Sequence, residues 1–225
     1  MSDRIIAACD GASKGNPGPA AWAWVTADAE ENPTRWEAGP LGSTTNNVAE
    51  LTALAELLEA TDPARPLEVR MDSQYAMNAV TKWIAGWKRN GWLTASKKPV
   101  ANRELVMRID ALLDGRPVEF RYVPAHQVDG DPLNAIADQA ASDSATSQQA
   151  AGTSHGTPTV PAPRAEALER PGGAKKAAKP ARRARTGGAT IKAKYAGRCG
   201  GCRGAYEAGA QVAKGPNGWG HPDCR

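Results

Sequence analysis

Four acidic side chains and one histidine occupy positions where a charged group needs a partner or can reach one. Asp10 follows the apolar run IIAAC, and Asp72 closes the alternating segment LEVRMD. Glu50 lies on an edge of the apolar face of TTNNVAELTALAELLEA, Asp138 lies in DGDPLNAIADQAA, and His126 follows VEFRYVPA. A charge at the end of a buried strand is unfavourable unless another group pairs with it. These five residues are therefore the candidates for chemistry.

Taken one at a time, each of these residues also has an ordinary structural role. Asp10 precedes a glycine and is suited to starting a turn. Glu50 is suited to a capping pair with the asparagine three residues earlier, and Asp72 to the N-cap of the next helix. Asp138 is suited to a solvated helix face, and His126 to a surface loop.

Taken together, the acids favour one shared site. Asp10 and Asp72 end strands that we expect to be neighbours in a sheet, and Glu50 faces that sheet from a helix. Carboxylates brought together repel one another and raise one another's pKa values, and a divalent cation removes this cost. Because oxygen ligands suit hard cations, we expect Mg²⁺ or Mn²⁺ at this site.

Strand-like and helix-like apolar patterns alternate over the first 142 residues. They predict strands at 4–10, 20–27, 34–39, 67–72 and 118–123, and helices at 46–60, 74–86, 102–113 and 132–142. Short turns join the first three strands, which should form an antiparallel meander, whereas helices separate the later strands, which should be parallel. The expected fold is α/β, with a five-stranded mixed sheet flanked by helices.

The composition changes after residue 142. From 143 to 190 small residues, Pro, Lys and Arg dominate, and no Phe, Trp or Tyr occurs between Tyr122 and Tyr195. Such a segment buries too little apolar surface to offset its ordering entropy, so we expect a disordered linker. The net charge is +4 over 225 residues, but Arg164 to Arg198 carries eleven Lys and Arg against two Glu, which favours contact with nucleic acid.

The sequence favours a cytoplasmic protein. No apolar run approaches the ~20 residues of a bilayer span, and the first residues lack the core of a signal peptide. We therefore expect no membrane partner, and we expect a monomer.

Three of the four cysteines lie near the C-terminus with the spacing C-x2-C, eighteen residues, then H-x2-C. In a reducing compartment this spacing predicts a structural Zn²⁺ site. Its ligands would be Cys199, Cys202, His221 and Cys224. So short a segment needs such a staple to fold, and we expect a small zinc-binding module at 191–225. Its role is open between a folding staple without a partner and a docking module for nucleic acid or protein.

Four segments, in order, resemble type 1 ribonuclease H. They are DGASKGNPGPAAWAWV, TTNNVAELTAL, MDSQYAMNAVTKWIAGWKRNGW and VPAHQVDGDPLNAIADQAA. The resemblance covers residues 1–142 and implies a catalytic domain that cleaves the RNA strand of RNA–DNA hybrids, with two divalent metals, leaving 5′-phosphate and 3′-hydroxyl ends. It implies that the metal ligands are Asp10, Glu50, Asp72 and Asp138, and that His126 is the family's mobile histidine.

The resemblance also implies contacts to the hybrid by five residues with amide or hydroxyl side chains: Asn16, Thr45, Asn46, Gln74 and Asn102. Thr45 and Asn102 would form a pocket for a DNA phosphate. Relatives often carry an arginine two positions before that threonine, where this chain has Ser43.

The segment TKWIAGWKRNGWLTASKKPVAN resembles the family's basic protrusion, which grips the DNA strand. Trp83 and Trp87 lie one helical turn apart, with Lys88 beside them. The alternative is a core aromatic pair beneath a solvated basic face. Asn90 and Leu93 stand where relatives can carry basic residues.

Two other functions compete with this interpretation. One is a non-catalytic hybrid-binding protein with the same fold, and the other is a different nuclease of the wider superfamily, such as a resolvase. The complete set of four carboxylates argues against the first. The basic protrusion and the TTNN motif argue against the second.

Overall fold

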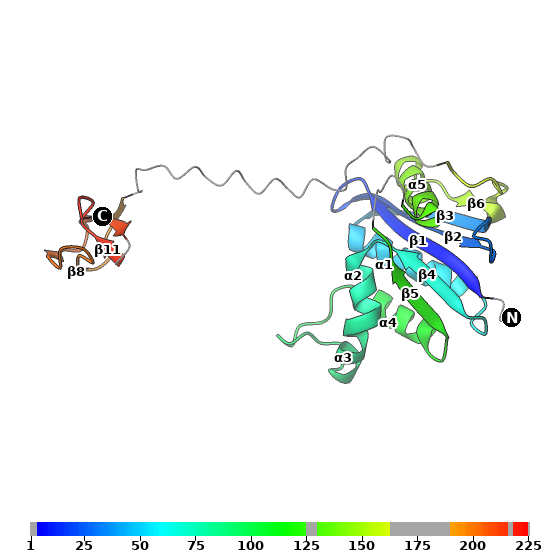
Figure 1. The fold of residues 1–225 in the computed structure, drawn as a ribbon, viewed down its shortest axis with the longest axis horizontal. Coiled ribbons are helices and arrows are strands. Elements are labelled where there is room, and N and C mark those ends of the chain that lie inside the picture. Colours follow the sequence, from blue (N-terminus) through cyan, green and yellow to red (C-terminus); the bar gives the residue numbers. More distant parts are fainter. Residues whose placement is uncertain (1–3, 125–129, 163–189, 216–217, 225) are drawn as a thin grey trace. The chain divides into compact units, whose positions relative to one another are not determined.

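The computed structural model describes residues 4–124, 130–162, 190–215 and 218–224. The chain divides into two compact units, Met1–Gly173 and Ala174–Arg225. Figure 1 shows the larger unit as a sheet with helices on both faces, and the smaller unit as a set of short strands. Within the described residues, no helix has the length and apolar character needed to cross a membrane.

The larger unit is built on a mixed sheet of six strands in the order β5-β4-β1-β2-β3-β6. β1, β2 and β3 pair antiparallel, whereas β4 is parallel to β1 and β5 is parallel to β4. The predicted meander and the parallel arrangement of the later strands are therefore confirmed. The strands are β1 Ile5–Ser13, β2 Gly18–Ala27, β3 Pro33–Thr44, β4 Leu67–Met71, β5 Val118–Tyr122 and β6 Ala151–Gly152.

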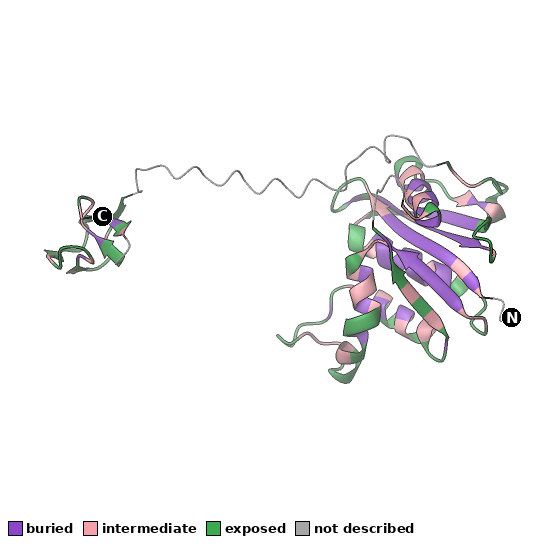
Figure 2. Ribbon diagram, viewed as in Figure 1, coloured by how far each residue is buried: buried purple, intermediate pink, exposed green. Residues whose placement is uncertain are grey.

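Helices cover both faces of this sheet, and each face has its own apolar core. Successive strand residues point to opposite faces, so Cys9 joins the core beneath α1 and α4, whereas Ala8 joins the core beneath α5. Figure 2 shows the buried residues concentrated along the central strands and the inner faces of the helices. The helices are α1 Asn46–Ala60, α2 Gln74–Asn78, the π-helical turn η1 Ala79–Trp83, α3 Ile84–Arg89, α4 Arg103–Leu113 and α5 Pro132–Ser147.

Several elements differ from the sequence prediction. β1 continues past Asp10 to Ser13, because its backbone pairs with β2 over that length. The single helix expected at 74–86 is interrupted by η1 and continues as α3. α5 continues to Ser147, because its additional turn packs buried residues against the sheet. β6 pairs with β3 and adds a sixth strand where five were predicted.

The predicted linker at 143–190 has structure at its start, since α5, β6 and the 3₁₀ turn η2 (Thr153–His155) extend into it. Residues 163–189 lie outside the described residues. The smaller unit has a three-stranded sheet, β11-β10-β7, and a two-stranded sheet, β8-β9. These strands are β7 Ile191–Lys192, β8 Gly197–Arg198, β9 Ala205–Tyr206, β10 Gln211–Gly215 and β11 Gly218–Gly220.

Candidate active site and metal centres

The parallel pairing of β1 and β4 brings two acids together. The register places Ala8 beside Arg70, and each acid follows two residues later, Asp10 within β1 and Asp72 directly after β4. Asp10 is buried inside β1, so its alternative role at the start of a turn is wrong. Asp72 is half-buried, and Ser73 caps α2 in its place, so the N-cap role for Asp72 is also wrong.

Glu50 reaches the same place because α1 packs on β1 without an intervening side chain. A Cβ on Gly11 would lie 2.2 Å from the backbone nitrogen of Glu50, so only glycine permits this approach. Thr45 is the N-cap of α1, and its Oγ1 accepts from the Val48 amide at 3.4 Å. The alternative capping pair between Asn47 and Glu50 is therefore not formed.

The carboxylates of Asp10, Glu50 and Asp72 form a compact group, with one oxygen from each lying within 4.8 Å of the others. Burial, followed by repulsion from Asp72, raises the pKa of Glu50 to about 8. Burial and the neighbouring carboxylates likewise raise the pKa of Asp10 well above its ordinary value. Burial and these same charges raise the pKa of Cys9, the residue before Asp10.

This donor set fits a hard divalent cation. Three oxygens lie close together in a desolvated site, and burial and the neighbouring carboxylates make ionisation of Asp10 and Glu50 more costly. A divalent cation with oxygen ligands reverses this effect by favouring the ionised forms.

Asp138 extends the group from α5. Its charge raises the pKa values of Asp10 and Glu50, although its oxygens lie outside the compact group. The side chain is half-buried, so it is not on a fully solvated helix face. His126 lies outside the described residues.

A residue that the sequence did not single out for the site, Asn134, connects α5 to the acids. Asp131 caps α5, as its Oδ1 accepts from the Asn134 amide at 2.9 Å. Asn134 Nδ2 donates to Asp72 Oδ2 at 3.3 Å. Asn134 Oδ1 is buried and has no hydrogen-bond partner among the described residues. Asn134 lies one helical turn before Asp138, and this spacing was the sequence feature that could have placed it beside the acids.

A buried arginine ties β4 to the start of α5. The Arg70 guanidinium is 3% exposed and contacts Glu68 at 2.8 Å, Glu31 at 2.5 Å and Asp131 at 2.8 Å. These acids raise the pKa of Arg70 further above its ordinary value, with the hydrogen bond to Glu31 as the largest cause. Because Asp131 is the N-cap of α5, the network fixes that helix relative to β4. The alternation of Glu68 and Arg70 with apolar residues in LEVRM was its only sequence signal.

Three of the proposed hybrid contacts surround the acids. Asn46 Nδ2 donates to Glu50 Oε1 at 3.2 Å, and the Asn46 backbone amide donates to Asn16 Oδ1 at 3.3 Å. Gln74 is exposed at the start of α2, two residues after Asp72. These side chains therefore form a polar margin beside the carboxylates.

Five proposed contacts remain. The hydroxyl of Thr45 caps α1, and the other four lie further along the chain: Trp83, Trp87, Lys88 and Asn102. Trp83 and Trp87 have ring centroids 5.5 Å apart, and Trp83 is 36% exposed, so they are not a fully buried core pair. Lys88 forms an ion pair with Asp110 at 2.8 Å. Asn102 has a left-handed backbone conformation, with φ of 56°, immediately before α4.

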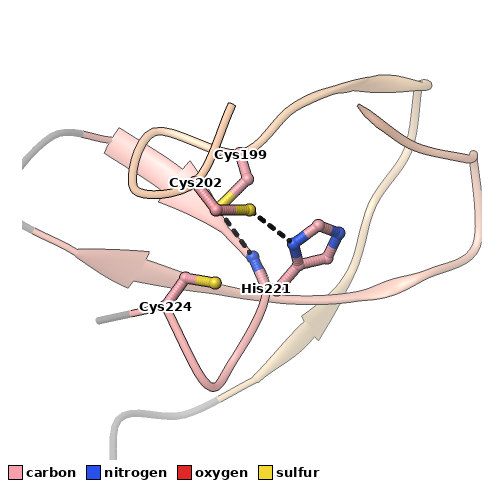
Figure 3. A group of neighbouring side chains, drawn as sticks. All are labelled: Cys199, Cys202, His221 and Cys224. Carbon is pink, nitrogen blue, oxygen red and sulfur yellow. Dashed lines mark hydrogen bonds between the residues drawn. The ribbon is translucent and has the colours of Figure 1, made fainter. Parts of the chain in front are cut away.

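The predicted zinc ligands converge in the smaller unit. Figure 3 shows Cys199, Cys202, His221 and Cys224 directed toward one another, and one ligand atom from each lies within 4.8 Å of the others. His221 Nδ1 lies 3.4 Å from Cys202 Sγ. Backbone amides, that of Cys202 first, lower the pKa of Cys199 to about 6, which favours the thiolate that binds metal. The four donors fit a tetrahedral structural zinc site.

Comparison with known proteins gives a consistent result. The family model described as RNase H matches residues 2–146. Ribonuclease HI of Streptomyces coelicolor is 65% identical over 227 residues, which cover 100% of this chain and 98% of that protein. Ribonuclease H of Tropheryma whipplei is 45% identical over 141 residues, which cover 62% of this chain and 83% of that protein.

A solved structure supports the fold. The crystal structure of LC9-RNase H1, described as a type 1 RNase H with the type 2 active-site motif, matches with a TM-score of 0.58 at 20% identity. The match covers 69% of this chain and 80% of that chain. The predicted fold class is therefore confirmed.

Proposed function

The chain belongs to the ribonuclease H family and hydrolyses the RNA strand of RNA–DNA hybrids, and from that premise we propose that Asp10, Glu50, Asp72 and Asp138 hold its divalent metals. The observation that supports this proposal is the group of Asp10, Glu50 and Asp72, whose oxygens lie within 4.8 Å of one another. The raised pKa values of Asp10 and Glu50 fit a site that is completed by a cation.

We propose a division of roles among the chain's own residues. Two Mg²⁺ ions, or Mn²⁺, would supply an activated attacking water and stabilisation of the leaving oxygen. Asp10 would help to hold both metals, as the resemblance implies. Asn134 orients the Asp72 carboxylate through its hydrogen bond. His126 moves a proton during cleavage or helps the product to leave, and the products carry 5′-phosphate and 3′-hydroxyl ends.

The polar margin is suited to recognising RNA without reading bases. Asn16, Asn46 and Gln74 present amides beside the carboxylates, and such groups can donate to and accept from a ribose 2′-hydroxyl. Thr45 and Asn102 contact a DNA phosphate in this proposal. Trp83, Trp87 and Lys88 contact the DNA strand.

We also propose that the catalytic domain extends beyond 142. α5, β6 and η2 all pack on the larger unit, so the folded catalytic part continues through His155. The basic segment that follows connects it to a module at 191–225, which binds one structural Zn²⁺ through Cys199, Cys202, His221 and Cys224.

Replacing Asp72 with asparagine tests the metal assignment. The substitution removes a ligand charge with little change in volume, so cleavage of a labelled hybrid in Mg²⁺ should be lost while circular dichroism stays that of the wild type. The thermal midpoint without Mg²⁺ should be equal or higher, because repulsion among the acids falls. Cleavage by Asp72→Asn at the wild-type rate would contradict the assignment. Hybrid binding without cleavage by the wild type would instead identify a non-catalytic binding protein.

A further inference from the structure

The smaller unit presents large apolar side chains that its own fold does not cover. In the described part of the chain six large apolar residues are exposed, and three of them belong to this unit: Ile191 at 48%, Tyr195 at 72% and Trp219 at 40%. Figure 2 shows that most of the unit's described residues are exposed. A unit with so little core gains most by burying its aromatic residues, so two aromatic rings in solvent require an explanation.

The β-sheet register assigns two of these side chains, Trp219 and Ile191, to a defined surface. Trp219 lies opposite Lys214, and Ile191 lies opposite Val212, so all four share one face of the β11-β10-β7 sheet. Val212 is buried, and we call the three exposed residues, Trp219, Lys214 and Ile191, the basic aromatic face.

The zinc ligands lie on the other side of this sheet. Gly220 is the residue after Trp219 and therefore points to the opposite face, where an added Cβ would lie 2.3 Å from Cys199 Sγ. The basic aromatic face is thus directed away from the metal cluster, and it is not part of the zinc site.

Positive charge accompanies the exposed rings. The described residues of the unit include five exposed cations, and none of them forms an ion pair with another described residue: Lys192, Lys194, Arg198, Arg203 and Lys214. Only Glu207 and Asp223 are acidic there, and a Zn²⁺ ion on three thiolates would lower the positive excess by one. Lys194 Nζ also lies 5.5 Å from the centroid of the Tyr195 ring. Each exposed ring therefore has a cation beside it.

We propose that the basic aromatic face binds single-stranded nucleic acid. Trp219 stacks on an unpaired base and Lys214 contacts the adjoining phosphate, while Tyr195 and Lys194 supply a second pair of the same kind. Aromatic rings stack on any exposed base, and unpaired cations follow the backbone, which is the combination that single strands require. A duplex keeps its bases stacked on one another, so it can use the cations but not the rings.

This binding goes beyond hydrolysis of the hybrid and does not depend on the metal assignment of the catalytic domain. Single strands continue from the ends of a hybrid, so a module that holds them would keep the nuclease near its substrate. The connection through one chain raises the local concentration of the catalytic domain even if the module binds weakly.

Fluorescence anisotropy of the full-length, zinc-loaded protein tests the proposal, without added Mg²⁺. The probes are labelled oligothymidylate, oligouridylate of the same length and a DNA duplex. Trp219→Ala should weaken binding to the single strands about fivefold or more, whereas Trp219→Phe should retain most of it. Zinc content and kcat on a short hybrid should stay at the wild-type values. A difference between the two single strands would identify DNA or RNA as the preferred ligand.

Lysine variants give a matched comparison that does not alter a ring. Lys214 is on the basic aromatic face and Lys192 is on the zinc side of the same sheet, so Lys214→Gln should weaken single-strand binding more than Lys192→Gln does. The proposal is overturned if Trp219→Ala binds both single strands as tightly as the wild type does. It is also overturned by tighter binding to the duplex than to either single strand. If Trp219→Ala loses zinc, equal affinities of the two lysine variants overturn it.

Discussion

Glu50 gives the metal-free protein a pH dependence whose sign follows from its environment. Its pKa is about 8 in the folded protein and close to the ordinary glutamate value when unfolded. Between those values the folded state holds a proton that the unfolded state has lost. The contribution of Glu50 to the free energy of unfolding is therefore fully present below its unfolded-state pKa. It is lost as pH rises through its folded-state pKa.

We expect the thermal midpoint of the Mg²⁺-free protein to fall between about pH 5 and about pH 8 more steeply than that of Glu50→Gln, whose amide does not titrate. Differential scanning calorimetry across this range measures both slopes. Saturating Mg²⁺ should remove the difference, because the metal favours the ionised carboxylate. Identical slopes for the two metal-free proteins would show that titration of Glu50 does not cause the fall in the thermal midpoint.

Arg70 should stabilise the protein far more than Arg108 does, although both arginines form two or more ion pairs. Arg70→Met leaves the Asp131 carboxylate without its cation and removes one of the cations beside Glu68, and breaking such a buried pair costs about 3–5 kcal/mol. Arg108 pairs with Glu56 and Glu59 but is 36% exposed, so Arg108→Met should cost about 1 kcal/mol or less. Urea unfolding compares the two variants.

A second measurement on Arg70→Met separates positioning from stability. Because Arg70 fixes the N-cap of α5, the Mg²⁺ concentration for half-maximal cleavage should rise in Arg70→Met and stay unchanged in Arg108→Met. An unchanged Mg²⁺ requirement in both would limit Arg70 to a structural role.

At the scale of elements, the sequence predicted the strands and helices whose apolar residues repeat with a strand or helix period. β1 to β5, α1, α4 and α5 each carry an alternating or helical pattern, and the acids in or next to these elements could be identified. The turn η1 could not, since its packing places Trp83 against Tyr75 and Trp87, which periodicity does not encode. β6 has two residues and no pattern, and it forms because β3 offers an open edge. Arg70 and Asn134 were missed as partners because they meet acids about sixty residues away.

The sixth strand should stabilise the fold without taking part in cleavage. Glu37 on β3 is buried, and it accepts from the Ser154 amide at 2.8 Å and from Ser154 Oγ at 2.7 Å. A chain ending at 147 loses both bonds, whereas a chain ending at 160 keeps them. The shorter chain should unfold at a lower urea concentration, because its free energy of unfolding falls by about 1–3 kcal/mol. Its kcat on a hybrid should be unchanged.

Ser154→Ala is the control for this truncation, because it removes the hydroxyl bond and keeps the backbone bond. The free energy of unfolding of Ser154→Ala should fall by about 1 kcal/mol, less than in the chain ending at 147. Equal stability of the chains ending at 147 and 160 would show that β6 contributes nothing to the fold.

At the scale of the whole molecule, the basic residues after 163 should contribute affinity and not chemistry. If they neutralise about four phosphates, raising salt from 50 to 200 mM should lower their contribution to binding by roughly 10². The full-length protein should therefore have a lower KM than the chain ending at 160 at low salt, and the two should converge at high salt with equal kcat. Equal KM values at every salt concentration would exclude contact between these residues and the hybrid.

Cys9 is 1% exposed in the central strand, with its thiol pKa raised by burial, and it lies far along the sequence from the other three cysteines. An alkylating reagent can reach this sulfur only when the core beneath α1 and α4 opens. The rate of Cys9 alkylation, measured by mass spectrometry of its peptide, therefore reports how often this core opens. Zinc-bound thiolates would be protected by a different process, loss of the metal. One labelling experiment on the intact chain can thus time the opening of the two units separately, without an added probe.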